Sequence, residues 1–239
     1  MRSPLPVRGL ALACLLAAAF DASASGLQIA PTSLEMAAAG PAQALWLTNT
    51  GDHELRAQVR AYKWSQSQGK DALEPTQALV ASPPMLTVPP GGRQLVRVIR
   101  TGQDGAAGEQ TYRLLVDELP LEAAKGTGVQ YVLRYSVPVF IGVSGTPQLK
   151  WSGAPSKEGL ELTVSNAGTA HAQIREVSLV CSGAATPIVP GLLGYVLLGA
   201  TMHWTIALPA GANATNASLK ALVNGDATDQ MLSPGAQPR

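Results

Sequence analysis

Apolar and polar residues alternate in short runs along most of this chain. Such alternation places the apolar side chains on one face of a β-strand. The runs lie at residues 44–48, 57–62, 95–100, 112–116 and 129–143. Turn-forming Gly and Pro residues separate many of these runs at intervals of about ten residues, which is typical of a β-sandwich. The pattern therefore predicts an all-β fold.

A short sequence pattern occurs twice in the chain. In the first copy, a predicted strand ends at residues 49–51 (Asn-Thr-Gly) and the next begins at residues 57–60 (Ala-Gln-Val-Arg). In the second copy, the corresponding segments are residues 166–168 (Asn-Ala-Gly) and 172–175 (Ala-Gln-Ile-Arg). The repeat indicates two domains of one architecture. We expect their boundary in the Gly- and Pro-containing segment at residues 142–147.

The first 24 residues differ from the rest of the chain. Arg2 and Arg8 precede a twelve-residue apolar run, and small residues follow at positions 22–24. Because this run is too short to span a bilayer comfortably, it predicts a cleaved signal peptide over residues 1–24 and export of the mature protein. A lipoprotein signal ending at Cys14 is the alternative, although the residues before that cysteine match it poorly.

Charged residues are scarce and balanced. They make up 14% of the chain, with 17 Lys and Arg against 16 Asp and Glu. About a quarter of a globular chain is usually charged. A near-neutral chain lacks the basic field that captures phosphates, which argues against a nucleic-acid partner. The hydrophobic content of 46% argues against intrinsic disorder.

The sequence contains no motif that points to catalysis. The three histidines are scattered without the spacing of a metal site, and a secreted hydrolase would need a triad that is not evident. Cys181 alone remains once the signal peptide is removed, and its alternating surroundings predict a small buried apolar residue. We therefore expect no enzyme activity, no catalytic residues, and no metal, cofactor or small-molecule substrate.

The segment at residues 129–140 differs from the other predicted strands. Its odd positions are all apolar or aromatic, whereas its even positions include Arg134, Ser136 and Pro138. Because proline has no N–H to donate, the segment is expected at a sheet edge or at a bulge. Two interpretations remain open: its apolar face belongs to the core of its own domain, or the strand is lent to a partner by β-augmentation.

Several sequence blocks are distinctive in combination. They are the turn at residues 49–51, the prolines at 83–84 and 89–90, YRLLVDELP at residues 112–120 and RYSVPVF at residues 134–140. Together they resemble the periplasmic pilus-assembly chaperones of the PapD-like chaperone–usher family. The last two blocks are most similar to its archaic, Csu-like branch. The similarity extends from residue 27 to about residue 151 and is weaker beyond it.

This resemblance implies two immunoglobulin-like β-sandwich domains in an L-shaped arrangement with a cleft between them. The N-terminal domain would comprise residues 25–144 and the C-terminal domain residues 145–239. The resemblance also implies donor-strand complementation, in which the G strand, here residues 129–140, fills the groove of a pilin subunit that lacks its last strand. By position, the donor side chains would be Val129, Tyr131, Leu133, Tyr135 and Val137.

The partners and location also follow from the resemblance. The chaperone would act in the periplasm and bind fimbrial subunits, of the spore-coat-U-like type for the archaic branch. It would then deliver each subunit to an outer-membrane usher. The alternative is a secreted immunoglobulin-like adhesin or structural pilus module, whose G strand would belong to its own core. A stoichiometric subunit complex that is lost on Leu133→Asp would distinguish the chaperone.

The anchor for the subunit's C-terminal carboxylate departs from the better-known branch of the family. That branch uses an Arg on the first strand and a Lys on the G strand, and the corresponding positions here are Ser33 and Pro138. We expect Arg113 to replace them, with Arg97 as the second candidate. A guanidinium matches a carboxylate in a bidentate geometry, and partial burial strengthens the contact. The alternative for Arg113 is a solvated strand residue.

Overall fold

We describe a computed structural model of the chain over residues 26–102, 108–120, 131–181, 183–209 and 217–234. The described residues form β-strands joined by turns and loops, which confirms the all-β prediction. None of them belongs to a helix long and apolar enough to cross a membrane. The predicted signal peptide and Val129 lie outside the described residues.

The strands before residue 142 form two sheets around one apolar core. One sheet has the order β1-β3-β8-β6, and the other has the order β2-β10-β9-β4-β5, with β7 also paired to β4. Alternate residues of both sheets, such as Leu45, Val98 and Leu114, meet in the core. The strands are β1 Leu27–Ala30, β2 Leu34–Met36, β3 Ala42–Asn49, β4 Leu55–Ser67, β5 Lys70–Pro75, β6 Leu79–Ser82, β7 Met85–Val88, β8 Arg93–Arg100, β9 Gln110–Leu119 and β10 Arg134–Ile141.

The strands after residue 148 form a second sandwich. Its sheets have the orders β15-β12-β11-β18 and β14-β13-β16-β17. Its core contains Trp151, Leu162 and Leu219, and it also receives Trp64 and Phe140 from the first sandwich. The strands are β11 Leu149–Ser156, β12 Gly159–Asn166, β13 Ala172–Cys181, β14 Ala184–Val196, β15 Thr201–Ile206, β16 Ser218–Val223, β17 Asp226–Met231 and β18 Ser233–Pro234.

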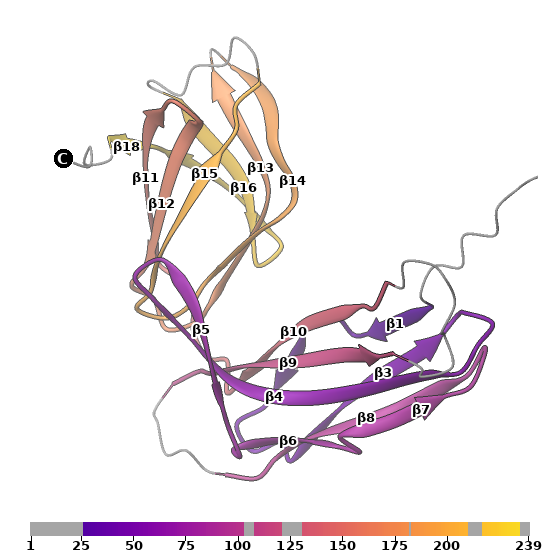
Figure 1. The fold of residues 1–239 in the computed structure, drawn as a ribbon. Coiled ribbons are helices and arrows are strands. Elements are labelled where there is room, and N and C mark those ends of the chain that lie inside the picture. Colours follow the sequence, from indigo (N-terminus) through magenta and orange to yellow (C-terminus); the bar gives the residue numbers. More distant parts are fainter. Residues whose placement is uncertain (1–25, 103–107, 121–130, 182, 210–216, 235–239) are drawn as a thin grey trace, which may run out of the picture.

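The two sandwiches meet at one corner and form an L (Figure 1). The hairpin of β4 and β5 extends from the first sandwich and lies against the second (Figure 1). At the tip of this hairpin, Gly69 forms an isolated bridge to Met202 in β15. This arrangement confirms the predicted two-domain, L-shaped fold.

The two copies of the sequence repeat occupy equivalent places, and the first is centred on Asn49. This residue ends β3 and is 1% exposed. Its side-chain amide donates to the carbonyls of His53 at 2.7 Å and Val88 at 3.0 Å, and its oxygen accepts from the Gly51 N–H at 3.0 Å. Asn49 thus satisfies buried backbone groups where the chain turns between β3 and β4.

Asn166 makes the same set of contacts at the end of β12. It donates to the carbonyls of Ala170 at 2.8 Å and Val196 at 3.1 Å, and it accepts from the Gly168 N–H at 2.9 Å. The Gln148 N–H donates to the same oxygen at 3.1 Å. The short repeat in the sequence therefore corresponds to one structural device used once in each sandwich.

Candidate functional site

The first half of β10 lies at an edge of its sheet. The strand pairs antiparallel with β9 over all eight of its residues and without a register shift. Its parallel partner β2 begins only at Val139. Among the described residues, the segment 134–138 therefore has no strand on its second side. An edge strand was one of the two placements predicted from Pro138, and the other, a bulge, is not observed here.

Pro138 fits this strand because hydrogen bonds alternate along an antiparallel ladder. The Glu118 N–H donates to the Leu133 carbonyl at 2.9 Å, so odd positions of the segment exchange bonds with β9 and even positions do not. Pro138 is an even position and takes no bond away from that ladder. By the same alternation, the backbone groups of Arg134 and Ser136 point toward the side that has no partner strand.

The predicted donor side chains become more buried along the chain, although β10 begins only at Arg134 and the described residues 131–133 of the predicted strand lie before it. Tyr131 is 79% exposed, and Val137 is 1% exposed. Between them, Leu133 and Tyr135 are half-buried against the core of the first sandwich, and the Tyr135 hydroxyl donates to the Leu27 carbonyl at 2.7 Å. Val137 belongs to that core in this structure. The apolar face thus serves the chain's own core at one end and extends beyond it at the other.

Asp117 forms ion pairs that connect the beginning of β10 to β4. Its carboxylate accepts from Arg60 in β4 at 2.7 Å and from Arg134 in β10. Burial alone would raise the pKa of the Asp117 carboxyl, but the hydrogen bonds from Arg60 and then Arg134 hold that pKa below its usual value. The adjacent Glu118 carboxylate accepts from the Leu133 N–H at 3.0 Å. The two acids therefore bind two successive residues, Leu133 just before β10 and Arg134 at its start.

A cleft of about 250 Å³ lies between the sandwiches beside β10. Pro138, one of the two positions that replace the usual Arg and Lys, lines it, and so does Thr32, the neighbour of Ser33. The second sandwich contributes side chains from β13 and β14. The lining residues are Thr32, Arg113, Ser136, Pro138, Gln173, Arg175, Glu176, Gly191, Leu192 and Tyr195.

Arg113 lies in this cleft with its guanidinium over the ring of Trp64 and near the ring of Tyr195. Its central carbon is 3.8 Å from the Trp64 ring centroid and 5.4 Å from that of Tyr195, and its side chain is 14% exposed. Burial lowers the pKa of Arg113, and the charge of Asp71, 3.9 Å away, opposes this shift. A guanidinium keeps its charge in proteins, so the cleft presents a largely desolvated cation. Its hydrogen bonds to Ser136 are long, at 3.5 Å to the carbonyl oxygen and 3.4 Å to the hydroxyl.

Arg97 lies away from this cleft. It is exposed on β8, where it pairs with Ala44 and Ser82 in the other sheet of the first sandwich. It is not one of the residues that line the cleft. The structure therefore does not bring the two predicted anchor residues together, and the geometry favours Arg113.

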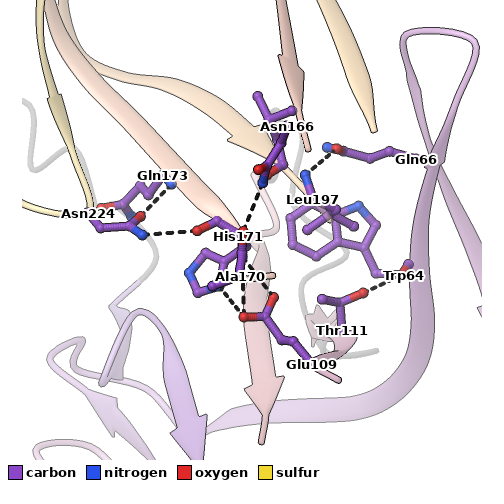
Figure 2. Close-up of polar contacts among 11 residues, drawn as sticks. Trp64, Gln66, Glu109, Thr111, Asn166, Ala170, His171, Gln173, Leu197 and Asn224 are labelled. Carbon is purple, nitrogen blue, oxygen red and sulfur yellow. Dashed lines mark hydrogen bonds and ion pairs between the residues drawn. The ribbon is translucent and has the colours of Figure 1, made fainter. Parts of the chain in front are cut away.

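Buried polar contacts connect the two sandwiches (Figure 2). The Glu109 carboxylate accepts from the His171 N–H at 3.2 Å and lies 2.9 Å from the His171 Nδ1. The Glu109 side chain is fully buried. The ring of Phe140, at the end of β10, stacks on His171 with a centroid distance of 3.4 Å. The strand that forms the edge is thus packed at its far end against the second sandwich.

The β4–β5 hairpin adds a second connection (Figure 2). The Gln66 side chain donates to the Tyr195 carbonyl at 3.0 Å and accepts from the Leu197 N–H at 2.8 Å. The backbone carbonyl of Trp64 accepts from the Thr111 hydroxyl at 2.6 Å, which joins β4 to β9 at the residue whose ring contacts Arg113. No motif in the sequence pointed to these residues, because each contact joins segments that are far apart along the chain.

The similarity to known proteins agrees with this geometry. A family model described as "Pili and flagellar-assembly chaperone, PapD N-terminal domain" matches residues 26–145, which is half of the chain. The chain belongs to this family. Its members are assembly chaperones and not enzymes. The described part of this chaperone also contains no cluster of three or more His, Cys, Asp or Glu side chains placed to bind a metal ion.

Solved structures of pilus chaperones share the fold. A chain of the CsuC–CsuE chaperone–tip adhesion subunit complex from archaic Csu pili of Acinetobacter baumannii is 24% identical, with a TM-score of 0.66 and coverage of 88% of this chain and 99% of that one. The YadV chaperone is 18% identical, with a TM-score of 0.62 and coverage of 87% and 100%. The Pseudomonas aeruginosa CupB2 chaperone is 17% identical, with a TM-score of 0.59 and coverage of 86% and 100%. Among curated proteins, no sequence matches this chain.

Proposed function

We propose that this chaperone binds fimbrial subunits in the periplasm by donor-strand complementation and delivers them to an outer-membrane usher. The family supports a role in pilus assembly, and the signal peptide predicted over residues 1–24 supports export. The YRLLVDELP and RYSVPVF blocks and the likeness to the Csu complex support a place in the archaic branch, and with it subunits of the spore-coat-U-like type. We assign residues 25–144 and 145–239 to the two domains.

The observation that carries this proposal is the open side of β10 at residues 134–138. Its even positions direct N–H and C=O groups toward a place where a partner strand can pair. A long edge strand with apolar side chains is normally a liability because it promotes aggregation. A subunit groove that lacks one strand would satisfy both the backbone groups and the apolar side chains.

The donor side chains in this proposal are Val129, Tyr131, Leu133 and Tyr135. Tyr131 is already exposed, and Leu133 and Tyr135 are half-buried. Full burial of an exposed apolar side chain by a partner contributes about 1.5–3 kcal/mol before ordering costs are subtracted, and a half-buried one contributes less. Val137, the fifth predicted donor, is left out of this set because it is buried in the chain's own core, where it holds the donor segment on the sandwich.

We further propose that Arg113 binds the C-terminal carboxylate of the subunit. The site offers a desolvated guanidinium beside the edge of β10, in a cleft between the two domains. A carboxylate can accept two parallel hydrogen bonds from such a group. Binding there would fix the register in which the subunit pairs with the donor segment.

Co-expression with a fimbrial subunit of the spore-coat-U-like type tests the proposal. Leu133→Asp should abolish the complex on size-exclusion chromatography, because a carboxylate cannot enter an apolar groove unpaired. Val132→Asp is the matched control. Val132 is the exposed neighbour of Leu133, and it is an even position, whereas the predicted donor side chains are at odd positions. We expect it to retain the subunit.

The folded state of each variant must be measured separately. Circular dichroism should show that Leu133→Asp remains folded, since Leu133 is only half-buried. If the subunit stays bound to folded Leu133→Asp, donor-strand complementation through this segment is wrong. If Leu133→Asp unfolds instead, the strand serves the chain's own core, as in an adhesin or structural module.

A further inference from the structure

The wall of the cleft opposite Arg113 carries an irregularity in a central strand. β13 pairs with β14 on one side and with β16 on the other. Both ladders shift register next to Arg175, and Glu176 has no partner in either described ladder. Arg175 and Glu176 both line the cleft. The irregularity therefore lies at the cleft wall and not in a remote part of the sheet.

Glu176 has a backbone conformation that glutamate rarely adopts. Its φ is +54°, in the left-handed region that favours Gly and, to a lesser degree, Asn and Asp. A bulge of this kind adds a residue to one strand and changes the direction of neighbouring side chains. Strain that persists in the middle of a sheet is often associated with a functional site.

The sequence repeat provides an internal comparison for Arg175. Arg60 occupies the corresponding position of the first copy, in β4, whose ladder with β9 has no register shift. Arg60 bonds to Asp117 at 2.7 Å. Arg175 is exposed, and it makes no ion pair within the described ranges. The arginine of the repeat thus forms an ion pair between two strands in the first domain, whereas in the second domain it lines the cleft.

We propose that Arg175 is a second binding residue for the subunit's C-terminal carboxylate, facing Arg113 from the other domain. This inference rests on the proposed function, and its ligand is the free α-carboxylate of a polypeptide. One domain would supply the stacked, desolvated guanidinium and the other an exposed one. A bound terminus would therefore contact both domains at once.

The acids near the two arginines indicate how the cleft recognises its ligand. Asp71 lies 3.9 Å from Arg113, and Glu176 lines the cleft beside Arg175. These acids offset the charge of the arginines, so net charge alone does not attract an anion. Each guanidinium presents a fork of N–H donors that matches the two oxygens of a planar carboxylate. The cleft therefore recognises a carboxylate by its hydrogen-bonding geometry.

The test compares two forms of the co-purified subunit, one with its native C-terminus and one extended by Gly-Ser-Gly. Each complex is mixed with an excess of tagged wild-type chaperone, and the rate of subunit exchange is measured. Arg175→Ala should speed the exchange of the native subunit about tenfold, the effect of one charge-assisted hydrogen bond. It should leave the exchange of the extended subunit unchanged, because the carboxylate there is displaced.

Arg175→Lys and Arg97→Ala serve as comparison variants. Lysine keeps the charge but not the fork, so the exchange rate should be intermediate. Arg97 is exposed outside the cleft, and its removal should have no effect. Equal acceleration of both subunit forms by Arg175→Ala, or no acceleration of either, would overturn the inference.

The outcomes separate this inference from the proposed function. If Arg113→Ala accelerates exchange of the native subunit and Arg175→Ala does not, Arg113 anchors the terminus alone. If neither arginine nor the extension changes the rate, the carboxylate anchor is wrong, while donor-strand binding is still judged by Leu133→Asp. If no subunit co-purifies with the wild-type chain, both proposals fail.

Discussion

Arg113 combines a permanent charge with a largely buried position. Removing a guanidinium from water is costly, and this cost is the reason that burial lowers its pKa. The faces of Trp64 and Tyr195 and the nearby Asp71 offset part of this cost. Asp71 is about half exposed and 3.9 Å away, so it does not occupy the hydrogen-bonding positions of the guanidinium. A ligand carboxylate is therefore expected to bind more strongly here than at a solvated arginine.

Replacing Arg113 by alanine should weaken subunit binding by about 1.5–3 kcal/mol, or roughly 10- to 150-fold, the range for charged hydrogen bonds. Arg113→Lys should recover only part of this loss, because an ammonium group lacks the bidentate fork. Titration of the purified variants with subunit measures both effects. Unchanged affinity in both variants would contradict the assignment of Arg113 as the anchor.

Asp117 should make stability depend on pH. Its pKa is lower in the folded chain than the ordinary carboxyl value of 3.8, so folding favours the charged form. Its contribution is therefore complete above about pH 5 and is lost as the pH falls through the ordinary value toward the folded one. Asp117→Asn should lower the melting temperature near neutral pH, and its difference from wild type should shrink between about pH 5 and 3.

The matched control for this pH dependence is Asp226→Asn. Asp226 is exposed at the start of β17, where it pairs with Val223 of β16. We expect its replacement to leave the melting temperature close to that of wild type at each pH. The contradicting result is a difference in melting temperature between wild type and Asp117→Asn that stays constant from about pH 5 to 3. That result would show that the charge of Asp117 does not stabilise the fold.

At the scale of the element, β10 has different surroundings along its length. Residues 139–141 pair on both sides, with β9 and β2, and their side chains are buried. Residues 134–138 pair only with β9 among the described residues. One strand is therefore held firmly at one end and presents an open edge at the other.

Ser136→Pro tests this open edge directly. The Ser136 N–H points away from β9, so proline there should leave the β9 ladder intact and remove one donor offered to a partner strand. We expect a folded chaperone whose affinity for subunit is reduced about 5- to 10-fold, the value of one backbone hydrogen bond. Isothermal titration with the purified subunit measures the affinity.

Ser136→Ala is the control for the lost hydroxyl, which lies 3.4 Å from Arg113. It keeps the backbone N–H, and we expect its affinity to be close to that of wild type. If Ser136→Pro binds as tightly as Ser136→Ala, the edge of β10 does not pair with the subunit in this register.

At the scale of the whole molecule, the two domains are joined by buried polar contacts as well as by apolar packing. Glu109 and His171 are 62 positions apart in the sequence and make contact through both backbone and ring. Gln66 makes two hydrogen bonds to the other domain. The Gln66 connection adjoins the cleft, because its partner Tyr195 is one of the cleft's lining residues.

Glu109→Ala should loosen this junction. It leaves two buried donor positions of His171 without their acceptor, at a cost of about 2–3 kcal/mol. We expect a lower melting temperature in calorimetry and separation of the unfolding of the two domains. Glu158→Ala, at an exposed turn, is the control, and an identical profile for the two variants would contradict a role for Glu109 in the junction.

The sequence by itself determined the class of fold and the positions of most strands that it predicted. Period-two alternation is a local property, and it correctly located strands at 44–48, 57–62, 95–100 and 112–116. The repeated Asn-x-Gly turn correctly indicated two similar sandwiches. Each asparagine bonds to a carbonyl four residues further along the chain, so this part of the turn is encoded locally and is visible as a sequence motif. Pro138 likewise indicated the edge strand, since a missing N–H restricts the position of a residue in any sheet.

Only the tertiary structure decided what covers each face and which residues share the cleft. Alternation cannot tell whether an apolar face meets its own core or a partner. Val137 and Tyr131 are both odd positions of the predicted strand, but Val137 is buried in the core and Tyr131 is exposed. Arg113 and Arg97 have similar sequence surroundings, but only Arg113 reaches the cleft. The cleft brings together strands from two domains, so its composition depends on how the domains dock. That docking is set by Glu109, Gln66 and the aromatic rings between the domains, through contacts that no local pattern records.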